Sequence, residues 1–191
     1  MSSREAILEA IAKNKPRPTA LPELLSFPSD EDLVAKYTQS VTLNGGTAIE
    51  VTSLDEVKAY IQENFLEDLQ VVSLIEEVPG TLEISSITDP HDLETVELAV
   101  VKGEVGAVEN AAIWVSEKNL PHRVLPFITQ HLIIILEKSN LVPNMHEAYR
   151  RIDVTKTGYG VFIAGPSKTA DIEQSLVIGA HGSRSLSVFL I

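Results

Sequence analysis

His131–Leu136 reads HLIIIL, five consecutive aliphatic residues after a single histidine. This short apolar run has no alternation of polar and apolar side chains, so it predicts a strand that is buried on both faces. Further strands of the same buried kind are predicted elsewhere in the chain. They are Thr47–Val51, Leu69–Leu74, Leu98–Val101, Ala112–Val115, Tyr159–Ala164 and Ser187–Leu190.

Helical patterns lie between several of these strands. Ser53 and Glu56 have capping-box spacing ahead of apolar residues at positions 54, 57 and 61, directly after the first strand. Another helix is predicted from about Asp30 to Gln39, before the helix-breaking Asn44-Gly45-Gly46. Strands of this kind interleaved with helices predict a mixed α/β fold, a three-layer α/β/α sandwich around a mostly parallel sheet. The acidic segment Ile75–Glu97 is predicted to be a surface excursion.

The first residues predict a separate arm. Ser2 and Glu5 form a capping box ahead of a stripe of small and aliphatic residues at positions 6, 7, 10 and 11. Prolines at positions 16, 18, 22 and 28 then predict an extended connection. We therefore expect a helix and proline-rich arm over residues 1–28 and a single α/β domain over residues 29–191. The arm is expected to pack on a neighbouring copy, which would make a homo-oligomer, or on the flank of its own domain.

Composition excludes several classes of function. The 191 residues contain 15 Lys or Arg against 27 Asp or Glu, a net charge of −12 with no basic cluster, so nucleic acid is not an expected partner. The apolar runs are too short to span a membrane and the first residues lack a secretory signal, which predicts a cytoplasmic protein. The chain has no cysteine and no histidines at metal-binding spacing, so we predict no metal site.

The segment Gly165–Gly182, GPSKTADIEQSLVIGAHG, is the predicted site. A strand up to Ala164, a sharp turn, and a helix from Thr169 to about Gly179 would place the turn at the carboxyl end of a strand. Helix amides would then point at a small polar or anionic ligand. Ser167 and Thr169 would add hydroxyls and Lys168 a charge, with Asp171 suited to a ligand that has donors. The alternative is that Ser167 or Thr169 only caps the helix.

Two further residues are candidates for chemistry. His181 lies between Gly179 and Gly182 and could transfer protons, or it could be a structural histidine. Glu109, next to Asn110, occupies a turn of small residues before a strand and could be a base or nucleophile, or a surface carboxylate. Trp114, in that strand, is expected in the core.

Residues 165–191, GPSKTADIEQSLVIGAHGSRSLSVFLI, resemble the C-terminal signature of the LUD-domain family, also called the lactate utilisation protein C family. The resemblance continues through Leu125-Pro126, the HLIIIL strand and a helix at His146–Ile152. It implies a sandwich of the sugar-isomerase and CoA-transferase-like type. It also implies an accessory or ligand-binding subunit in the oxidation of L-lactate to pyruvate. Iron–sulfur clusters are expected only on partner proteins, and no cofactor is expected in this chain.

We predict a set of ligand-binding positions in this chain, of which those between residues 165 and 182 match the family pattern. They are Glu109, Asn110, Gly165, Pro166, Ser167, Lys168, Thr169, Asp171, Gly179, His181 and Gly182. The chain departs from the pattern twice. Glu109-Asn110-Ala111-Ala112 stands where many members resemble Glu-Thr-Gly-Thr, and Ser183 stands where a proline is expected.

Two other functions stay open on the residues alone. Glu109-Asn110 also resembles the Ser-Glu-Asn-Gly nucleophile motif of CoA transferases. This would make the chain a free-standing enzyme for a CoA-like or phosphorylated small molecule, with Glu109 or His181 catalytic. Alternatively, the signature segment could only dock a partner protein. A concave pocket containing Lys168 and His181 would favour ligand binding, and a flat face would favour docking.

Overall fold

A computed structural model describes residues 2–17, 19–20, 22–23, 25, 27, 32–65, 68–171 and 174–191. At its centre is a five-stranded sheet in which every neighbouring pair of strands is parallel. The strand order is β1 (Thr47–Glu50), β11 (Ser185–Leu190), β6 (His131–Leu136), β3 (Leu98–Lys102) and β2 (Val71–Ser73). The HLIIIL segment is therefore the middle strand.

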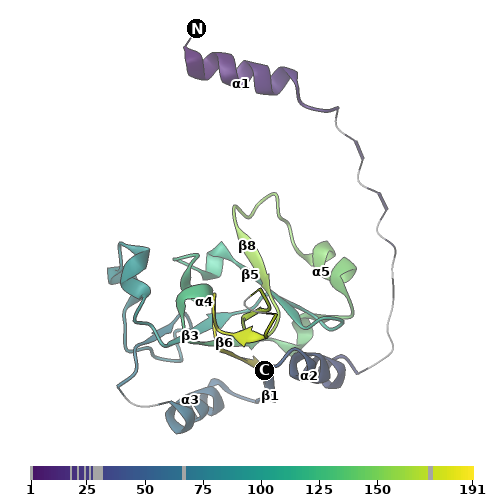
Figure 1. Cartoon of the computed structure of the whole chain (residues 1–191). Helices are drawn as coiled ribbons and strands as arrows, with labels where there is room; N and C mark the ends of the chain where they lie inside the picture. Colours follow the sequence, from purple (N-terminus) through teal and green to yellow (C-terminus); the bar gives the residue numbers. More distant parts are fainter. Residues whose placement is uncertain are drawn as a thin grey trace.

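Both faces of the central sheet are covered, as the absence of alternation in β6 predicts. Leu132, Ile134 and Leu136 belong to one buried cluster, while Ile133 and Ile135 belong to another on the opposite face. The helix α3 (Leu54–Asn64) covers the second cluster. The helices α2 (Leu33–Leu43) and α4 (Leu125–Ile128) lie with the first (Figure 1). The predicted mixed α/β class with a mostly parallel central sheet is confirmed.

A second sheet, of four strands, shares the α2 side of the central sheet. Its order is β7 (Leu141–Val142), β4 (Val105–Ala107), β5 (Ala112–Ser116) and β8 (Gly160–Ile163). Two of the predicted strands, β5 and β8, therefore pair antiparallel with each other outside the central sheet. Gly160 permits this pairing, because a Cβ there would approach the Trp114 ring at 2.1 Å. Trp114 is buried, as expected.

The excursion between β2 and β3 is irregular, as predicted, but it also closes one edge of the central sheet. The amides of Thr81 and Leu82 donate to the Val71 carbonyl, and the Thr81 hydroxyl accepts from the Val71 amide at 2.8 Å. Buried Val78 and Leu93 anchor the segment. The remaining short elements are η1 (Ile84–Ser86), η2 (Pro90–Leu93), η3 (Glu117–Asn119), η4 (Lys138–Asn140) and α5 (Met145–Arg151).

The predicted helix starts are correct in part. In α1 (Ser3–Lys13) the capping box is present, since Ser2 Oγ accepts from the Glu5 amide and Glu5 Oε2 accepts from the Ser2 amide. At α3 the capping-box prediction is wrong, because the Ser53 side chain makes no cap hydrogen bond. Glu56 accepts from the amide and the hydroxyl of Thr52. The α2 helix begins later than predicted and runs to Leu43, with Asp32 as its cap.

The predicted helix after Thr169 is wrong. Lys168–Thr169 (β9) instead pairs antiparallel with Val177–Ile178 (β10), forming a small hairpin, and residues 172–173 lie outside the described part of the chain. The β-branched Thr169, Val177 and Ile178 suit extended pairing. Gly179 follows β10 and does not end a helix, and its φ of +79° favours glycine.

The helix α1 stands apart from the rest of the protein (Figure 1), and none of its side chains is buried. The predicted boundary between residues 1–28 and 29–191 stays a prediction, and Pro18 and Pro28 of the arm lie outside the described residues. Within the described ranges, no helix has the length and apolar character needed to cross a membrane.

Candidate functional site

The signature turn, Gly165–Lys168, follows β8 and is held on two sides by backbone hydrogen bonds. The Ser167 amide donates to the Ser183 carbonyl at 2.9 Å, and the Ser167 carbonyl accepts from the Gly179 amide at 3.0 Å. Gly165 has a φ of +76°, and a Cβ there would lie 2.5 Å from the Asn44 carbonyl oxygen. The turn is thus fixed against three separate segments.

The two ends of the signature segment meet at one cavity of about 280 Å³, which we call the signature pocket. Gly182 packs so closely on Ser167 that a Cβ would lie 3.0 Å from the Ser167 Cβ. Buried Pro126 and half-exposed Phe127 from α4 complete the wall. The lining residues are Pro126, Phe127, Phe162, Ile163, Ala164, Gly165, Pro166, Ser167, Lys168, His181, Gly182 and Ser183.

The position of this pocket differs from the prediction. His181–Arg184 leads into β11, and the Arg184 amide donates at 2.8 Å to the carbonyl of Gln130, which leads into β6. The pocket therefore lies at the amino ends of the central strands, whereas the predicted place was the carboxyl end of a parallel strand. The cause is that β8 belongs to the second sheet. No helix starts at Thr169, so helix amides do not provide the anion site that was predicted there.

Lys168 is linked to a segment that the sequence analysis did not include in the site. Its ammonium donates a hydrogen bond to the Asn44 carbonyl, and the Asn44 side-chain amide donates to the Asn110 carbonyl at 2.7 Å. Asn44 therefore joins the signature turn to the turn that contains Glu109. The Asn-Gly-Gly sequence predicts the end of a helix. It does not predict that Asn44 contacts Lys168 and Asn110.

Five of the predicted positions do not line the signature pocket. Thr169 and Asp171 lie in the hairpin, where the Asp171 amide donates to the Thr169 hydroxyl at 3.3 Å and the Asp171 side chain is exposed. Glu109 and Asn110 lie in the turn between β4 and β5, outside the described lining of this pocket. Gly179 supports the turn through its bond to Ser167.

Glu109 has a structural contact of its own. Its Oε1 accepts from the Met145 amide at 2.7 Å, at the first residue of α5, where Asn144 already caps the helix by accepting from the Glu147 amide. A carboxylate at a helix start is favoured by the exposed amides there. Ala111, which stands at the glycine of the family pattern, keeps a left-handed φ of +56°.

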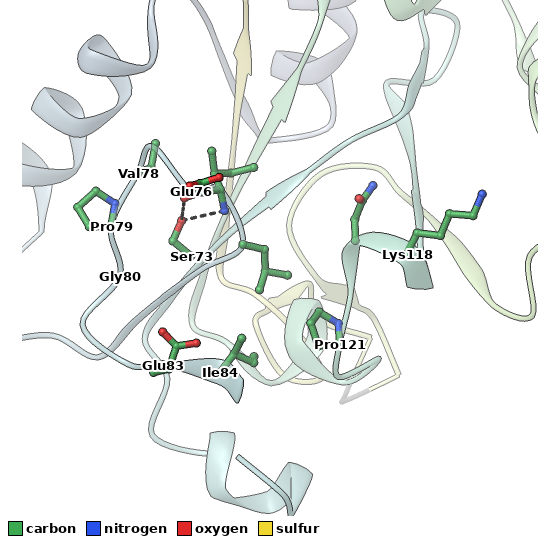
Figure 2. A pocket seen from close by; sticks show the side chains of 12 residues that line it. Ser73, Glu76, Val78, Pro79, Gly80, Glu83, Ile84, Lys118 and Pro121 are labelled. Carbon is green, nitrogen blue, oxygen red and sulfur yellow. Dashed lines mark hydrogen bonds between the residues drawn. The ribbon is translucent and has the colours of Figure 1, made fainter. Parts of the chain in front are cut away.

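A second, larger cavity of about 540 Å³ lies at the carboxyl end of β2. Figure 2 shows Ser73, Glu76 and Glu83 on the side of the excursion, with Lys118 and Pro121 across from them. The Ser73 hydroxyl is held by Ile75, to which it donates and from which it accepts at 3.2 Å. No local pattern in the sequence signals this cavity, because its walls come from segments about 40 residues apart.

Among the described residues, no group of three or more His, Asp or Glu side chains is close enough together to hold a metal ion. The prediction that the chain has no metal site stays a prediction.

Comparison with known proteins identifies the family. Residues 91–191, more than half of the chain, match the LUD domain model, so the chain belongs to the LUD-domain family. A lactate utilization protein C from Bacillus pumilus is 35% identical over 95 residues, which cover 47% of this chain and 40% of that protein. The chain thus matches less than half the length of that relative.

Two other similarities extend over more of the molecule. A lactate utilization protein C from Exiguobacterium is 25% identical over 223 aligned positions, covering 100% of this chain and 96% of the relative. The crystal structure of a DUF162 family protein from Deinococcus radiodurans superposes with a TM-score of 0.64 at 15% identity, covering 83% of this chain and 95% of that one. At that identity the structure supports the fold alone.

Proposed function

We propose that this LUD-domain protein binds a small carboxylic acid in the signature pocket and acts as an accessory subunit in the oxidation of L-lactate to pyruvate. It would do so in the cytoplasm, together with partner proteins that carry iron–sulfur clusters. The observation that carries the proposal is the meeting of Ser167, Lys168 and His181, from both ends of the signature segment, at one concave cavity.

The size and chemistry of the pocket suit a ligand of a few heavy atoms. A cavity of about 280 Å³ lies just below the range typical of drug-sized ligands. A 2-hydroxy acid offers a carboxylate, which accepts hydrogen bonds, and a hydroxyl, which also donates. Lys168 and Ser167 can donate to the carboxylate, and His181 can exchange a proton with the hydroxyl or accept its hydrogen bond. Lys168 matters because the chain as a whole, with a net charge of −12, repels anions.

The proposed division of labour follows from composition and from the relatives. The 191 residues contain no cysteine, so a cysteine-ligated cluster would have to lie on another chain. The curated relatives are named lactate utilization protein C, which supports lactate as the starting point for tests.

Ligand binding is tested by titrating the purified chain with L-lactate and pyruvate in a calorimeter. We expect Lys168→Met to weaken binding by about tenfold or more, since a charge-assisted hydrogen bond is lost. Lys118→Met is the matched control, because it removes the same charge from the larger cavity. If Lys118→Met abolished binding while Lys168→Met did not, the ligand would belong to the larger cavity and the proposed site would be wrong.

The role in a pathway is tested by growth and by reconstitution. Deletion of the gene should impair growth on L-lactate, and restoring the Lys168→Ala, His181→Ala double variant, which removes two side chains of the pocket, should not rescue it. Lactate oxidation by the purified protein with its partners provides the direct readout. If the double variant supported the same rate as the unchanged chain, the pocket would not be the functional site.

The CoA-transferase-like alternative is not favoured. It needs Glu109 as acceptor of an acyl group, but that carboxylate accepts the first amide of α5. Intact-mass measurement with an acyl-CoA is the direct test, and a trapped glutamyl thioester that disappears in Glu109→Gln would revive the alternative. The docking alternative is also weaker, because Lys168 and His181 line a concave pocket.

A further inference from the structure

The helix α1 has an apolar stripe with no partner among the described residues of its own chain. Ile7, Leu8 and Ile11 have exposed fractions of 60%, 49% and 53%, and no side chain of the helix is buried. The helix is nevertheless well formed at its start by the Ser2–Glu5 capping box. A helix of 11 residues is marginal in water without tertiary packing, so a partner for this stripe is expected.

A groove of about 450 Å³ lies between α3 and the strand edge at β2. Half-buried Ile61 from α3 and half-buried Phe65, which directly follows that helix, line it together with Leu69 and Val71. Its apolar lining is of the kind into which an amphipathic helix inserts side chains spaced three or four residues apart. Ile7 and Ile11 have that spacing.

The charges of the two surfaces are complementary. Residues 2–17 contain four Lys or Arg and two Glu, a net charge of +2 in a chain of net charge −12. Residues 54–83, which provide the groove, contain eight Asp or Glu and only Lys58, a net charge of −7. Basic residues at positions 13, 15 and 17 directly follow the apolar stripe. When the stripe binds in the groove, they would lie close to the acidic residues around it.

The arm leaves the domain at a place away from the chain's own groove. Its far end is fixed on the domain at Phe27, whose carbonyl accepts from Asn144 Nδ2 at 3.2 Å and whose ring lies 5.2 Å from that of His146. Both partners flank the start of α5, which lies away from α3 in Figure 1. The 13 residues between Lys13 and Phe27 are rich in proline, and a proline-rich segment of that length spans roughly 40 Å.

We infer that α1 of one copy docks, through Ile7 and Ile11, in the groove between α3 and residues 69–81 of a second copy, and that two copies exchange their arms reciprocally. Each copy has one helix and one groove, so in a reciprocal pair both helices and both grooves are occupied. This is the arrangement of a two-fold dimer. The inference is independent of the ligand in the signature pocket.

Sedimentation of the full chain over a range of concentrations tests the dimer. We expect Ile7→Gln with Ile11→Gln to raise the dimer dissociation constant by about tenfold or more, because glutamine keeps helix propensity but loses the apolar contact. Glu9→Gln, on the opposite face of α1, is the matched control and should leave the constant unchanged. A chain that stays monomeric at every concentration, or a dimer that the double variant does not weaken, would overturn the inference.

Cross-linking of a mixture of unlabelled and nitrogen-15-labelled chains identifies which copy provides the groove. A zero-length carbodiimide should join Lys13 or Lys15 to Glu63 or Asp68, and about half of the cross-linked peptide pairs should combine the two isotopes if two copies exchange arms. Pairs in which both peptides always have the same isotope would show that α1 folds back on its own domain, and the inference would be wrong.

Discussion

The signature turn (Gly165–Lys168) and the Glu109 turn (Glu109–Ala112) both contact Asn44, yet their side chains have different surroundings. In the signature turn, Ser167 and Lys168 line a cavity that His181 also reaches. In the Glu109 turn, the carboxylate accepts the first amide of α5, and the Asn110 side chain accepts the Ala112 amide at 3.1 Å. Residues from one family pattern therefore divide into a ligand-facing turn and a turn that organises the backbone.

The largest difference is expected from glycine substitutions on the two sides of the Asn44 contact. Gly165→Ala would combine left-handed strain with a backbone clash at 2.5 Å from the Asn44 oxygen, so we expect a loss of about 3 kcal/mol in the free energy of unfolding. Denaturant titration measures this loss.

Gly45→Ala is the matched control for that prediction. Gly45 has a φ of +79°, but a Cβ there would only meet the end of the Lys168 side chain at 3.5 Å. The strain alone should cost about 1 kcal/mol. Equal losses in the two variants would mean that the Asn44 contact does not constrain the signature turn.

Substitution of Glu109 distinguishes the structural role from a catalytic one. Glu109→Ala should lower the free energy of unfolding by about 1 kcal/mol, the usual cost of a lost helix-capping contact, and leave ligand binding unchanged. Glu109→Gln should lose less, because its amide oxygen can still accept from Met145. Unchanged stability with lost ligand binding or lost activity would place Glu109 with the functional turn instead.

The strands of the fold could be predicted because a short run of apolar residues is enough to indicate a buried strand. HLIIIL has aliphatic side chains for both faces, and the structure places it in the middle of the parallel sheet. Pairing is a long-range property, and it was therefore missed for Tyr159–Ala164. That segment has the same apolar character as a central strand, but it pairs with β5 in the second sheet, where Gly160 lies opposite Ser116 and leaves room for the Trp114 ring.

The site could be predicted only as far as one segment of sequence defines it. Gly165–Lys168 and His181–Gly182 do meet at one pocket, but the link through Asn44 joins residues 124 positions apart and has no local signal. The helix expected from Thr169 failed for a related reason. Its first residues suit a helix start, while the pairing of Lys168–Thr169 with Val177–Ile178 depends on a partner strand.

The free energy of unfolding should also depend on pH through His131, the first residue of β6. Partial burial lowers the pKa of His131, the nearby Arg184 lowers it further, and Glu97 opposes the shift. Below about pH 6.5 the unfolded chain then binds more protons than the folded one, so the free energy of unfolding falls as the pH is lowered. The slope should stay well under the roughly 1.4 kcal/mol per pH unit of one full proton.

Comparison of unchanged and variant chains isolates this contribution. His131→Gln should flatten the decline in unfolding free energy between about pH 7 and about pH 5. His91→Gln is the control of opposite sign, because the Asp89 side chain raises the pKa of His91 and favours its charged form in the folded protein. A steeper decline in His131→Gln would contradict the assignment.

The smallest effect is expected at Ala111, where this chain departs from the glycine of the family pattern. Ala111→Gly should relieve about 1–2 kcal/mol of left-handed strain at a φ of +56°. It should also lose about 0.8 kcal/mol from burial of the methyl group, and about 0.5–1 kcal/mol from the greater freedom of glycine in the unfolded chain. These opposing contributions predict a net change near zero in the free energy of unfolding. An increase in the free energy of unfolding clearly above 1 kcal/mol would mean that Ala111 keeps this turn in a strained conformation. Backbone strain of that kind is found at functional sites, so the result would favour a functional role for the Glu109 turn.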